Sequence, residues 1–219
     1  MSPGPPTDGG PARVVRVPPE RLPGWVRGFQ GRHGDLQVTA QEDTLELLAA
    51  DGAQALLAVP FPPWQPGADP VAAYLEHAGR DRVVGAVLVR KGGYAVGRFA
   101  GRELLESKTD STYVQGRTKA GGWSQQRYAR RRDNQSAKAY AEAADVTARL
   151  LLPHADRLEA VVSGGDQVAV TAVLADPRLR PLLALALPRT HPVPDPRLRV
   201  LQAFPDTFLA VEVTLNALA

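Results

Sequence analysis

The sequence has no cysteine among its 219 residues. This absence excludes disulfides and zinc sites that use cysteine ligands. It also has no run of about 18 apolar residues, which a membrane-spanning helix would need. The first ten residues are rich in proline and glycine and lack both the basic start and the apolar core of a secretory signal. We therefore expect a cytoplasmic protein with no membrane association.

Metal-binding patterns are lacking too. No metal-ligand spacing occurs among the four histidines, which are His33, His77, His154 and His191. Glu103, Glu106 and Asp110 are carboxylates that could in principle hold Mg²⁺ for RNA cleavage. Successive side chains of a strand point to opposite faces, so these three would not all face one side. We therefore expect them at a solvated strand edge. We expect no metal and no cofactor.

What the chain does contain is enough apolar material for a real core, because 44% of its residues are hydrophobic. The proline and glycine content of residues 1–12 predicts a disordered tail. We expect residues 13–219 to form a single domain, with a helix and a hairpin at its N-terminal side, that acts as a monomer.

Turn signals organise the first half of the chain. Asp51-Gly52 between two apolar runs predicts a hairpin, and Asp69-Pro70 predicts the capped start of a helix that ends near Ala78. A short helix is predicted within 18–34 by apolar residues three and four apart. Tight turns then join three predicted strands into an antiparallel meander, over residues 83–90, 94–100 and 103–107.

A long helix dominates the second half, from about Ser124 to Leu152. Its stripe of small residues predicts close packing on a sheet, and at 1.5 Å per residue it would be roughly 40 Å long. A strand over 158–163 and a helix over 167–174, capped by Asp166, follow. The last apolar segment, 208–218, fits either a strand or a helix. The predicted fold class is α/β, a mixed sheet flanked by helices.

Positive charge is concentrated around the start of the long helix. Between Ser111 and Lys138 there are seven Lys or Arg and one acid, Asp133, in a chain whose net charge is only +3. The rest of the chain is therefore net negative. A concentrated positive segment beside a glycine-bearing loop is typical of a phosphate-rich partner.

The same segment contains one of three G-x-x-Q tetrapeptides. With 20 glycines and 11 glutamines, chance alone gives about one such match, so the tetrapeptide by itself has no weight. Context separates the three. Only the match from Gly122 to Gln125 is flanked by basic residues on both sides and opens a long helix. For the match from Gly164 to Gln167, the glycines are predicted to serve a turn.

The sequence from Gly121 to Arg130, Gly-Gly-Trp-Ser-Gln-Gln-Arg-Tyr-Ala-Arg, resembles the loop and helix of eukaryotic and archaeal class I release factors. Those carry Gly-Gly-Gln, then Ser, and then an Arg-aromatic-Ala-Arg run. Here Trp123 stands where that Gln would be, and Gln125 follows two residues later. This arrangement resembles the Vms-like release-factor branch, in particular its short actinobacterial type, a peptidyl-tRNA hydrolase. The motif covers about 25 residues, and the wider resemblance of strand, loop and helix covers 90–165.

The resemblance implies the ribonuclease-H-like sheet of the release-factor catalytic domain. It also implies hydrolysis of the ester between nascent peptide and tRNA, on stalled ribosomes or large subunits. The implied partners are peptidyl-tRNA and the rRNA of the large ribosomal subunit. The implied catalytic residues are Gln125, Gly122 and Gly121. The residues expected to bind RNA are Arg117, Lys119, Trp123, Arg127, Arg130, Arg131 and Arg132.

Ester hydrolysis of this kind needs a directed water and donors for the developing oxyanion. It needs neither a nucleophilic side chain nor a metal, because the ester is reactive and the RNA supplies binding energy for positioning. Gln125 can orient water and donate a hydrogen bond, but it cannot act as a general base at neutral pH. Proton transfer would then fall to the terminal ribose hydroxyl of the substrate.

Two other functions stay open at this point. One is an endoribonuclease that cuts the tRNA near its 3′ end, and the other is a non-catalytic module that binds the ribosome or tRNA. A serine hydrolase is disfavoured because Ser124 lacks the second glycine of a nucleophile elbow. The loop lacks a cluster of His, Lys and carboxylates, which favours ester hydrolysis over RNA cleavage.

Overall fold

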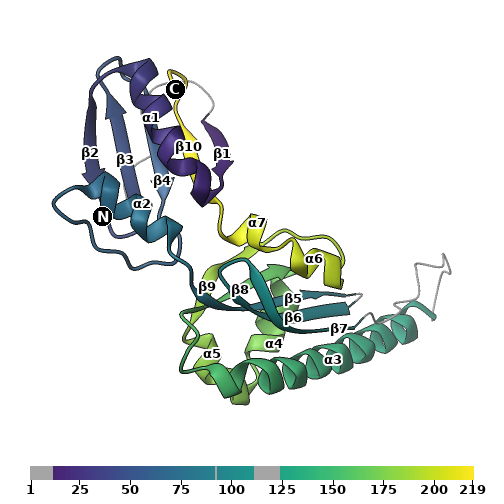
Figure 1. The fold of residues 1–219 in the computed structure, drawn as a ribbon. Coiled ribbons are helices and arrows are strands. Elements are labelled where there is room, and N and C mark those ends of the chain that lie inside the picture. Colours follow the sequence, from purple (N-terminus) through teal and green to yellow (C-terminus); the bar gives the residue numbers. More distant parts are fainter. Residues whose placement is uncertain (1–11, 92, 111–123) are drawn as a thin grey trace. The chain divides into compact units, whose positions relative to one another are not determined.

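A computed structural model of the chain describes residues 12–91, 93–110 and 124–219, with the backbone alone over 124–136. These residues form two compact units, 1–80 with 209–219 and 81–208, which we call the first unit and the second unit. The sequence-based expectation was one domain over 13–219. Each unit instead has its own five-stranded sheet (Figure 1). The predicted tail lies outside the described residues except for its last residue.

The described strands are β1 (Arg13–Val17), β2 (Leu36–Ala40), β3 (Thr44–Ala49), β4 (Gln54–Ala58), β5 (Val83–Arg90), β6 (Gly93–Ala100), β7 (Glu103–Asp110), β8 (Ala160–Gly165), β9 (Ala186–His191) and β10 (Val211–Leu215). The α-helices are α1 (Leu22–His33), α2 (Pro70–Gly79), α3 (Ser124–Leu151), α4 (Gln167–Leu174), α5 (Arg180–Leu183), α6 (Leu198–Gln202) and α7 (Pro205–Phe208). Three 3-10 turns are η1 (Pro19–Arg21), η2 (Leu152–His154) and η3 (Pro177–Leu179). Among the described residues no helix is long and apolar enough to cross a membrane.

The first unit is an antiparallel sheet in the order β1-β10-β4-β3-β2, with α1 and α2 packed against it (Figure 1). Leu22, Val26 and Phe29 of α1 recur at three and four residues and are buried in its core, as the sequence pattern predicts. The Asp69 side chain accepts hydrogen bonds from the N–H groups of Val71 and Ala72, which confirms the predicted helix cap.

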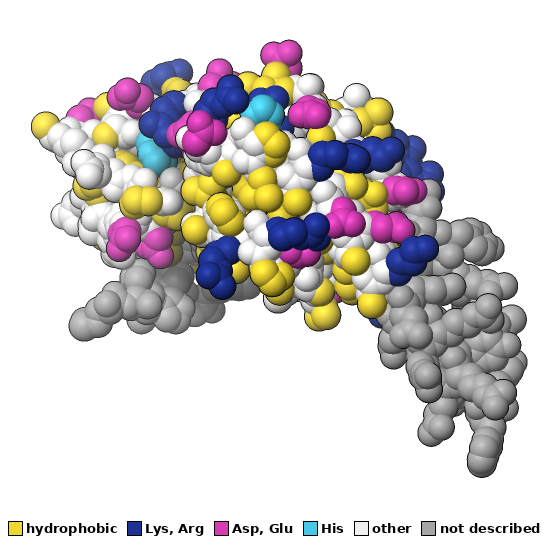
Figure 2. All heavy atoms as spheres, turned by 90° about the horizontal axis from the view of Figure 1, so that it is seen from below, with side chains coloured by type: hydrophobic (Ala, Val, Ile, Leu, Met, Phe, Trp, Pro, Cys, Tyr) yellow, Lys and Arg dark blue, Asp and Glu magenta, His cyan; other side chains and the backbone are white. Residues whose placement is uncertain are grey.

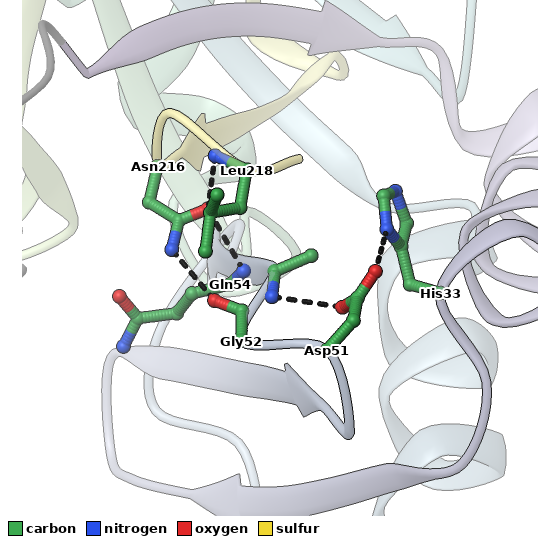
Figure 3. Close-up of polar contacts among 7 residues, drawn as sticks. His33, Asp51, Gly52, Gln54, Asn216 and Leu218 are labelled. Carbon is green, nitrogen blue, oxygen red and sulfur yellow. Dashed lines mark hydrogen bonds and ion pairs between the residues drawn. The ribbon is translucent and has the colours of Figure 1, made fainter.

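The predicted hairpin at Asp51-Gly52 joins β3 to β4, and polar contacts connect it to the end of α1 and to the segment after β10 (Figure 3). The Asp51 carboxylate accepts a hydrogen bond from the Ala53 N–H at 3.0 Å and contacts His33 Nδ1, at the end of α1, at 2.8 Å. Asn216 lies just after β10. Its side chain donates to the Gly52 carbonyl at 2.9 Å and accepts from the Gln54 N–H at 3.1 Å. The turn is thereby joined to segments far away in the sequence.

The second unit contains a mixed sheet in the order β7-β6-β5-β8-β9. Strands β5, β6 and β7 form the predicted antiparallel meander, and β8 and β9 extend it in parallel with β5. Four strands therefore run in one direction and β6 runs against them. A meander extended in this way is the ribonuclease-H-like arrangement that the resemblance implies, so the predicted fold class is confirmed for this unit.

Helices cover both faces of the second sheet. On one side α3 and α4 pack on a core that includes Val87, Val96 and Leu151. On the other side Phe99 of β6 packs against Phe208, and Phe208 against Phe204, with ring centroids 5.7 and 5.2 Å apart. The unit is a three-layer sandwich of helices, sheet and helices (Figure 1).

The long helix lies close to the sheet because both surfaces are built from small residues. Ala143 and Ala144 of α3 are buried. At Gly85 of β5, an added Cβ atom would lie only 2.9 Å from Leu151 Cδ1. Arg178 in η3 pairs with Asp145 of α3 at 2.7 Å. The second half of α3 is therefore fixed against the rest of the unit.

Several strands were not predicted. Strands β1 and β2 are short and are not bounded by turn residues at each end. Strand β9 lies in a proline- and arginine-rich segment, a composition that does not indicate a strand. The segment left open as strand or helix contains strand β10. Glu103, Glu106 and Asp110 are exposed on the edge strand β7, as expected.

Removing the charge of Asp51 should lower the stability of the first unit at neutral pH. The pKa of Asp51 lies below its ordinary value of 3.8 because the Ala53 N–H and the His33 side chain hydrogen-bond to the carboxylate. A pKa that is lower in the folded chain adds stability above the unfolded-state pKa, and that stability disappears as the pH falls through the folded-state pKa. The Asp51→Asn protein keeps an acceptor for Ala53 but lacks the charge.

Thermal unfolding should therefore show a lower melting temperature for Asp51→Asn than for the wild type near pH 7. The difference should vanish at the acidic end of a series that extends below pH 3.8. Glu42→Gln, at an exposed carboxylate with no ion pair among the described residues, is the matched control and should follow the wild type throughout. A difference that grows towards acid pH would contradict the assignment.

Candidate functional site

The segment singled out by the sequence connects the edge strand β7 to α3. Strand β7 ends at Asp110 and α3 begins at Ser124. Five of the predicted site residues lie between them, outside the described residues, and these are Arg117, Lys119, Gly121, Gly122 and Trp123. Three glycines, at 116, 121 and 122, predict an extended or poorly ordered loop over 111–123, and this segment also lies outside the described residues. The other five are on the first turns of α3, where the backbone is described, and these are Gln125, Arg127, Arg130, Arg131 and Arg132.

The register of the sheet places this connection at one edge. Asp110 pairs with Tyr94, Tyr94 with Val89, and Val89 with Gly165. Because β5, β7 and β8 run in the same direction, all three end along this line. In sheets of this kind, binding sites lie beyond the carboxyl ends of the parallel strands. The candidate loop therefore leaves the sheet at the end where a site is expected.

The length of α3 takes its first turns past this edge. Its 28 residues span roughly 42 Å at 1.5 Å each, whereas an eight-residue strand such as β5 spans roughly 26 Å. The side chains of α3 that are buried among the described ones begin at Ala139. In Figure 1 the N-terminal part of the helix ribbon extends beyond the strands.

The backbone at the start of α3 offers unpaired donors. The first four N–H groups of a helix have no acceptor within the helix, and Gln125 is the second residue of α3. The helix dipole also places partial positive charge at this end. The main chain around Gln125 is therefore suited to hold an anion or a developing oxyanion, independently of the glutamine side chain.

Two cations at the same edge were missed by the sequence reasoning. Arg90 ends β5, is exposed, and donates to the Val193 carbonyl at 3.0 Å, with Asp195 3.8 Å away. Lys91 follows it and is also exposed. The signal was available, because Arg90 is the last residue of the predicted strand over 83–90 and Lys91 directly follows it. Nearby, burial raises the pKa of the Tyr94 phenol, and the charges of Asp110 and Glu142 add to that effect.

The face of the molecule viewed from below Figure 1 has mixed charge. Figure 2 shows its described Lys and Arg side chains interspersed with Asp and Glu. No large area of one sign is visible among those side chains.

The other G-x-x-Q match of the second unit has a structural role. Gly165 ends β8 with φ +107°, and a Cβ atom there would collide with the Val89 carbonyl oxygen. Asp166 then caps α4, accepting hydrogen bonds from the N–H groups of Val168 and Ala169. Both glycine and aspartate are explained by this strand-to-helix turn, as the sequence analysis predicted.

No group of three His, Cys, Asp or Glu residues suited to hold a metal ion occurs in the described part of the chain.

Comparison with protein families decides what kind of domain this is. A family model described as the actinobacteria/chloroflexi VLRF1 release factor matches residues 81–214. The chain belongs to the VLRF1 release-factor family. The match spans the whole second unit and ends within β10, whereas residues 1–80 of the first unit lie outside it. The resemblance stated from Gly121 to Arg130 is therefore confirmed at the level of the family.

Solved structures and curated proteins add less. The chain is similar to an archaeal translation termination factor, aRF1, at 16% identity and a TM-score of 0.39, covering 87% of this chain and 62% of that one. A second structure, titled only as an archaeal protein, has 16% identity, a TM-score of 0.38 and the same coverage. The chain of this VLRF1 family member thus spans less than two thirds of the archaeal factor. No curated protein matches it.

Replacement of Gly165 by alanine should destabilise the second unit. A non-glycine residue at this positive φ costs about 1–3 kcal/mol before the collision with Val89 is counted. Chemical denaturation followed by circular dichroism measures the loss. Gln167→Ala is the control, because Gln167 is exposed and makes one long contact with Thr171 Oγ1 at 3.4 Å. Unchanged stability in the Gly165→Ala protein would refute the structural role of this turn.

Proposed function

We propose that this chain is a peptidyl-tRNA hydrolase that frees nascent peptides from stalled ribosomes or large ribosomal subunits. The observation that supports it best is the position of the Gly121-Gly122…Gln125 segment. In a chain of the VLRF1 release-factor family, it connects the carboxyl end of a sheet strand to the amino end of α3. Its partners would be peptidyl-tRNA and the rRNA of the large subunit, in the cytoplasm.

The chemistry follows from the groups at the start of α3. Glycines 121 and 122 let the main chain enter a narrow space because they have no side-chain bulk. The unpaired N–H groups of the first helical turn, with the Gln125 amide, would orient water and donate to the oxyanion as it forms. The terminal ribose hydroxyl of the tRNA would carry the proton, since no amide can act as a base at neutral pH.

Binding would come from the basic residues around this segment. Arg130 and Arg131 follow Arg127 by three and four residues, a spacing that places all three on one side of α3 near its start. Arg132, Arg117 and Lys119 add further charge. These residues would hold tRNA or rRNA phosphates, and Trp123 would stack on a terminal base. This binding energy is what positions the ester.

Gln125→Ala should abolish rapid peptide release and leave binding and folding intact. Loss of one donor to water or oxyanion typically costs about 3–4 kcal/mol, or about 10²–10³ in rate. The measurement is single-turnover release of peptide from peptidyl-tRNA on isolated large subunits. Trp123→Ala, in contrast, should weaken binding more than it slows the chemical step.

Gln126→Ala is the matched control for this experiment. It removes the same amide one position along α3, about 100° around the helix axis, and should keep most of the activity. Full activity of the Gln125→Ala protein would reject the proposed mechanism. Loss in Gln126→Ala alone would keep the proposed reaction and move the catalytic role by one residue.

The product distinguishes ester hydrolysis from RNA cleavage. Hydrolysis leaves an intact tRNA 3′ end that an aminoacyl-tRNA synthetase can charge again, whereas an endonuclease leaves a shortened tRNA. Gel analysis of the tRNA after release, followed by recharging, reads this directly. A shortened tRNA would replace the hydrolase with the endonuclease, and absence of turnover would leave a binding module.

Charge reversal of Arg130, Arg131 and Arg132 to glutamate should weaken ribosome or RNA binding and flatten its salt dependence. The melting temperature should hardly change, because the buried contacts described for α3 begin at Ala139. Binding measured over a salt series and thermal unfolding test the two expectations together. A large loss of fold stability would show that these arginines are structural.

A further inference from the structure

The first unit contains a cleft with an unusual share of the unit's positive charge. The cleft has a volume of about 640 Å³ and lies between α1 and the edge strand β1, with Leu215 of β10 also lining it. This volume falls within the roughly 300–1,000 Å³ typical of ligand sites. Five arginines line it, and these are Arg13, Arg16, Arg21, Arg27 and Arg32.

The charge is segregated rather than simply abundant. The first unit contains six basic residues and ten acids, so it is net negative. Five of the six basic residues line this cleft, whereas Glu20 is the one acid that does. The chain's preference for arginine over lysine explains the residue type but not this concentration in one place.

Most of this charge is not neutralised within the unit. Arg16 pairs with Glu212 at 3.7 Å. In the part of the chain that the structure describes, no ion pair involves Arg13, Arg21, Arg27 or Arg32, and all of them are exposed. Exposed guanidinium groups that converge on a cleft are suited to bidentate contacts with phosphate oxygens.

An aromatic surface lies among these arginines. Trp25 of α1 lines the cleft and is only half-buried, and its ring stacks on the buried Phe29 at 5.5 Å with an interplanar angle of 15°. Phe29 therefore holds one side of the indole in place. Arg21 directly precedes α1, and Trp25 and Arg32 are seven residues apart within it, so Trp25 and Arg32 share one side of the helix. A half-open indole between guanidinium groups is the combination by which proteins stack a base and hold its phosphates.

Helix α1 also has glycines where packing demands none. Gly24 and Gly31 are exposed, and a Cβ atom added at either would meet no atom within 4 Å. Glycine in a helix is unfavourable relative to alanine. The described packing therefore gives no reason for these two glycines, whereas a helix surface without a Cβ atom lets a ligand backbone approach closely. Gly24 itself lines the cleft.

From these observations we propose that the first unit is a second RNA-binding site, which holds a single-stranded RNA segment with a base on Trp25 and phosphates on the surrounding arginines. It lies almost entirely outside the part of the chain that matches the VLRF1 family. It does not depend on the proposed hydrolase activity. RNA is favoured over an acidic peptide because every nucleotide supplies both a planar base for Trp25 and a phosphate for the arginines.

The test measures binding of a fluorescent single-stranded RNA of about ten nucleotides, a length in the range that one such site covers. All proteins carry Arg130→Glu, Arg131→Glu and Arg132→Glu, so that the start of α3 contributes little. Arg21→Gln with Arg32→Gln should weaken binding at least about tenfold. The slope of log K against log salt should fall by about 1.4, the value for two lost contacts at about 0.7 each.

Matched variants separate this site from general charge and stability effects. Arg80→Gln removes the one basic residue of the unit outside the cleft and should leave affinity and salt slope unchanged. Trp25→Leu should weaken binding and leave the slope unchanged. Gly24→Ala should keep or raise the melting temperature while it weakens RNA binding, a combination that a purely structural role would not give.

Three results would overturn the proposal. The first is unchanged RNA affinity in the Arg21→Gln, Arg32→Gln protein. The second is equal affinity for a mononucleotide, which would assign the cleft to a free nucleotide instead of a strand. The third is equal affinity for polyglutamate, which would assign it to an acidic protein. Because peptide release is not measured here, failure of this site and failure of the hydrolase proposal are distinguishable.

Discussion

The contact between α3 and the mixed sheet is the constraint on which the second unit depends. Strand β8 is parallel to β5, so the chain must cross over from the end of β7 to the start of β8, and α3 is that crossover. Close packing is possible because α3 presents alanines and β5 has Gly85 opposite Leu151. The helix direction is then fixed, with its start at the carboxyl ends of the strands. This packing therefore determines that the loop between β7 and α3 starts and ends on the side of the carboxyl ends of the strands.

Helix α3 is longer than packing on the sheet requires, and its extra length positions the start of the helix. The packed half of α3 is held by buried residues and by the pair of Arg178 with Asp145. The first half continues the same rigid rod away from that support. A helical extension fixes where the loop begins better than a flexible linker would, and the proposed hydrolysis of a single ester requires such positioning.

Much of this could be predicted from the sequence, for local reasons. The caps at Asp69 and Asp166, the hairpin at Asp51-Gly52, the meander and the long helix all depend on residues close together in the chain. The family followed from the residues after Gly121. In contrast, the division into two units depends on pairing between β1, β10 and β4. These strands are far apart in the sequence, and each is too short for its residue pattern to indicate which strand it pairs with. The arginine-lined cleft could not be predicted from the sequence for the same reason. Its arginines alternate with apolar residues over 13–32 and form a group only when α1 lies beside β1.

The place of β10 in the first sheet has a consequence for how the chain acquires its structure. This strand lies between β1 and β4, and it arrives only after the entire second unit has been made. The first unit is thus an interrupted domain with the second inserted into it. During synthesis from the N-terminus, the second unit is complete while the first still lacks the strand between β1 and β4. Edges of β1 and β4 are open until then, and open edges invite wrong pairing. A chain that stops a few residues early would have an intact release-factor unit beside a first sheet split in two.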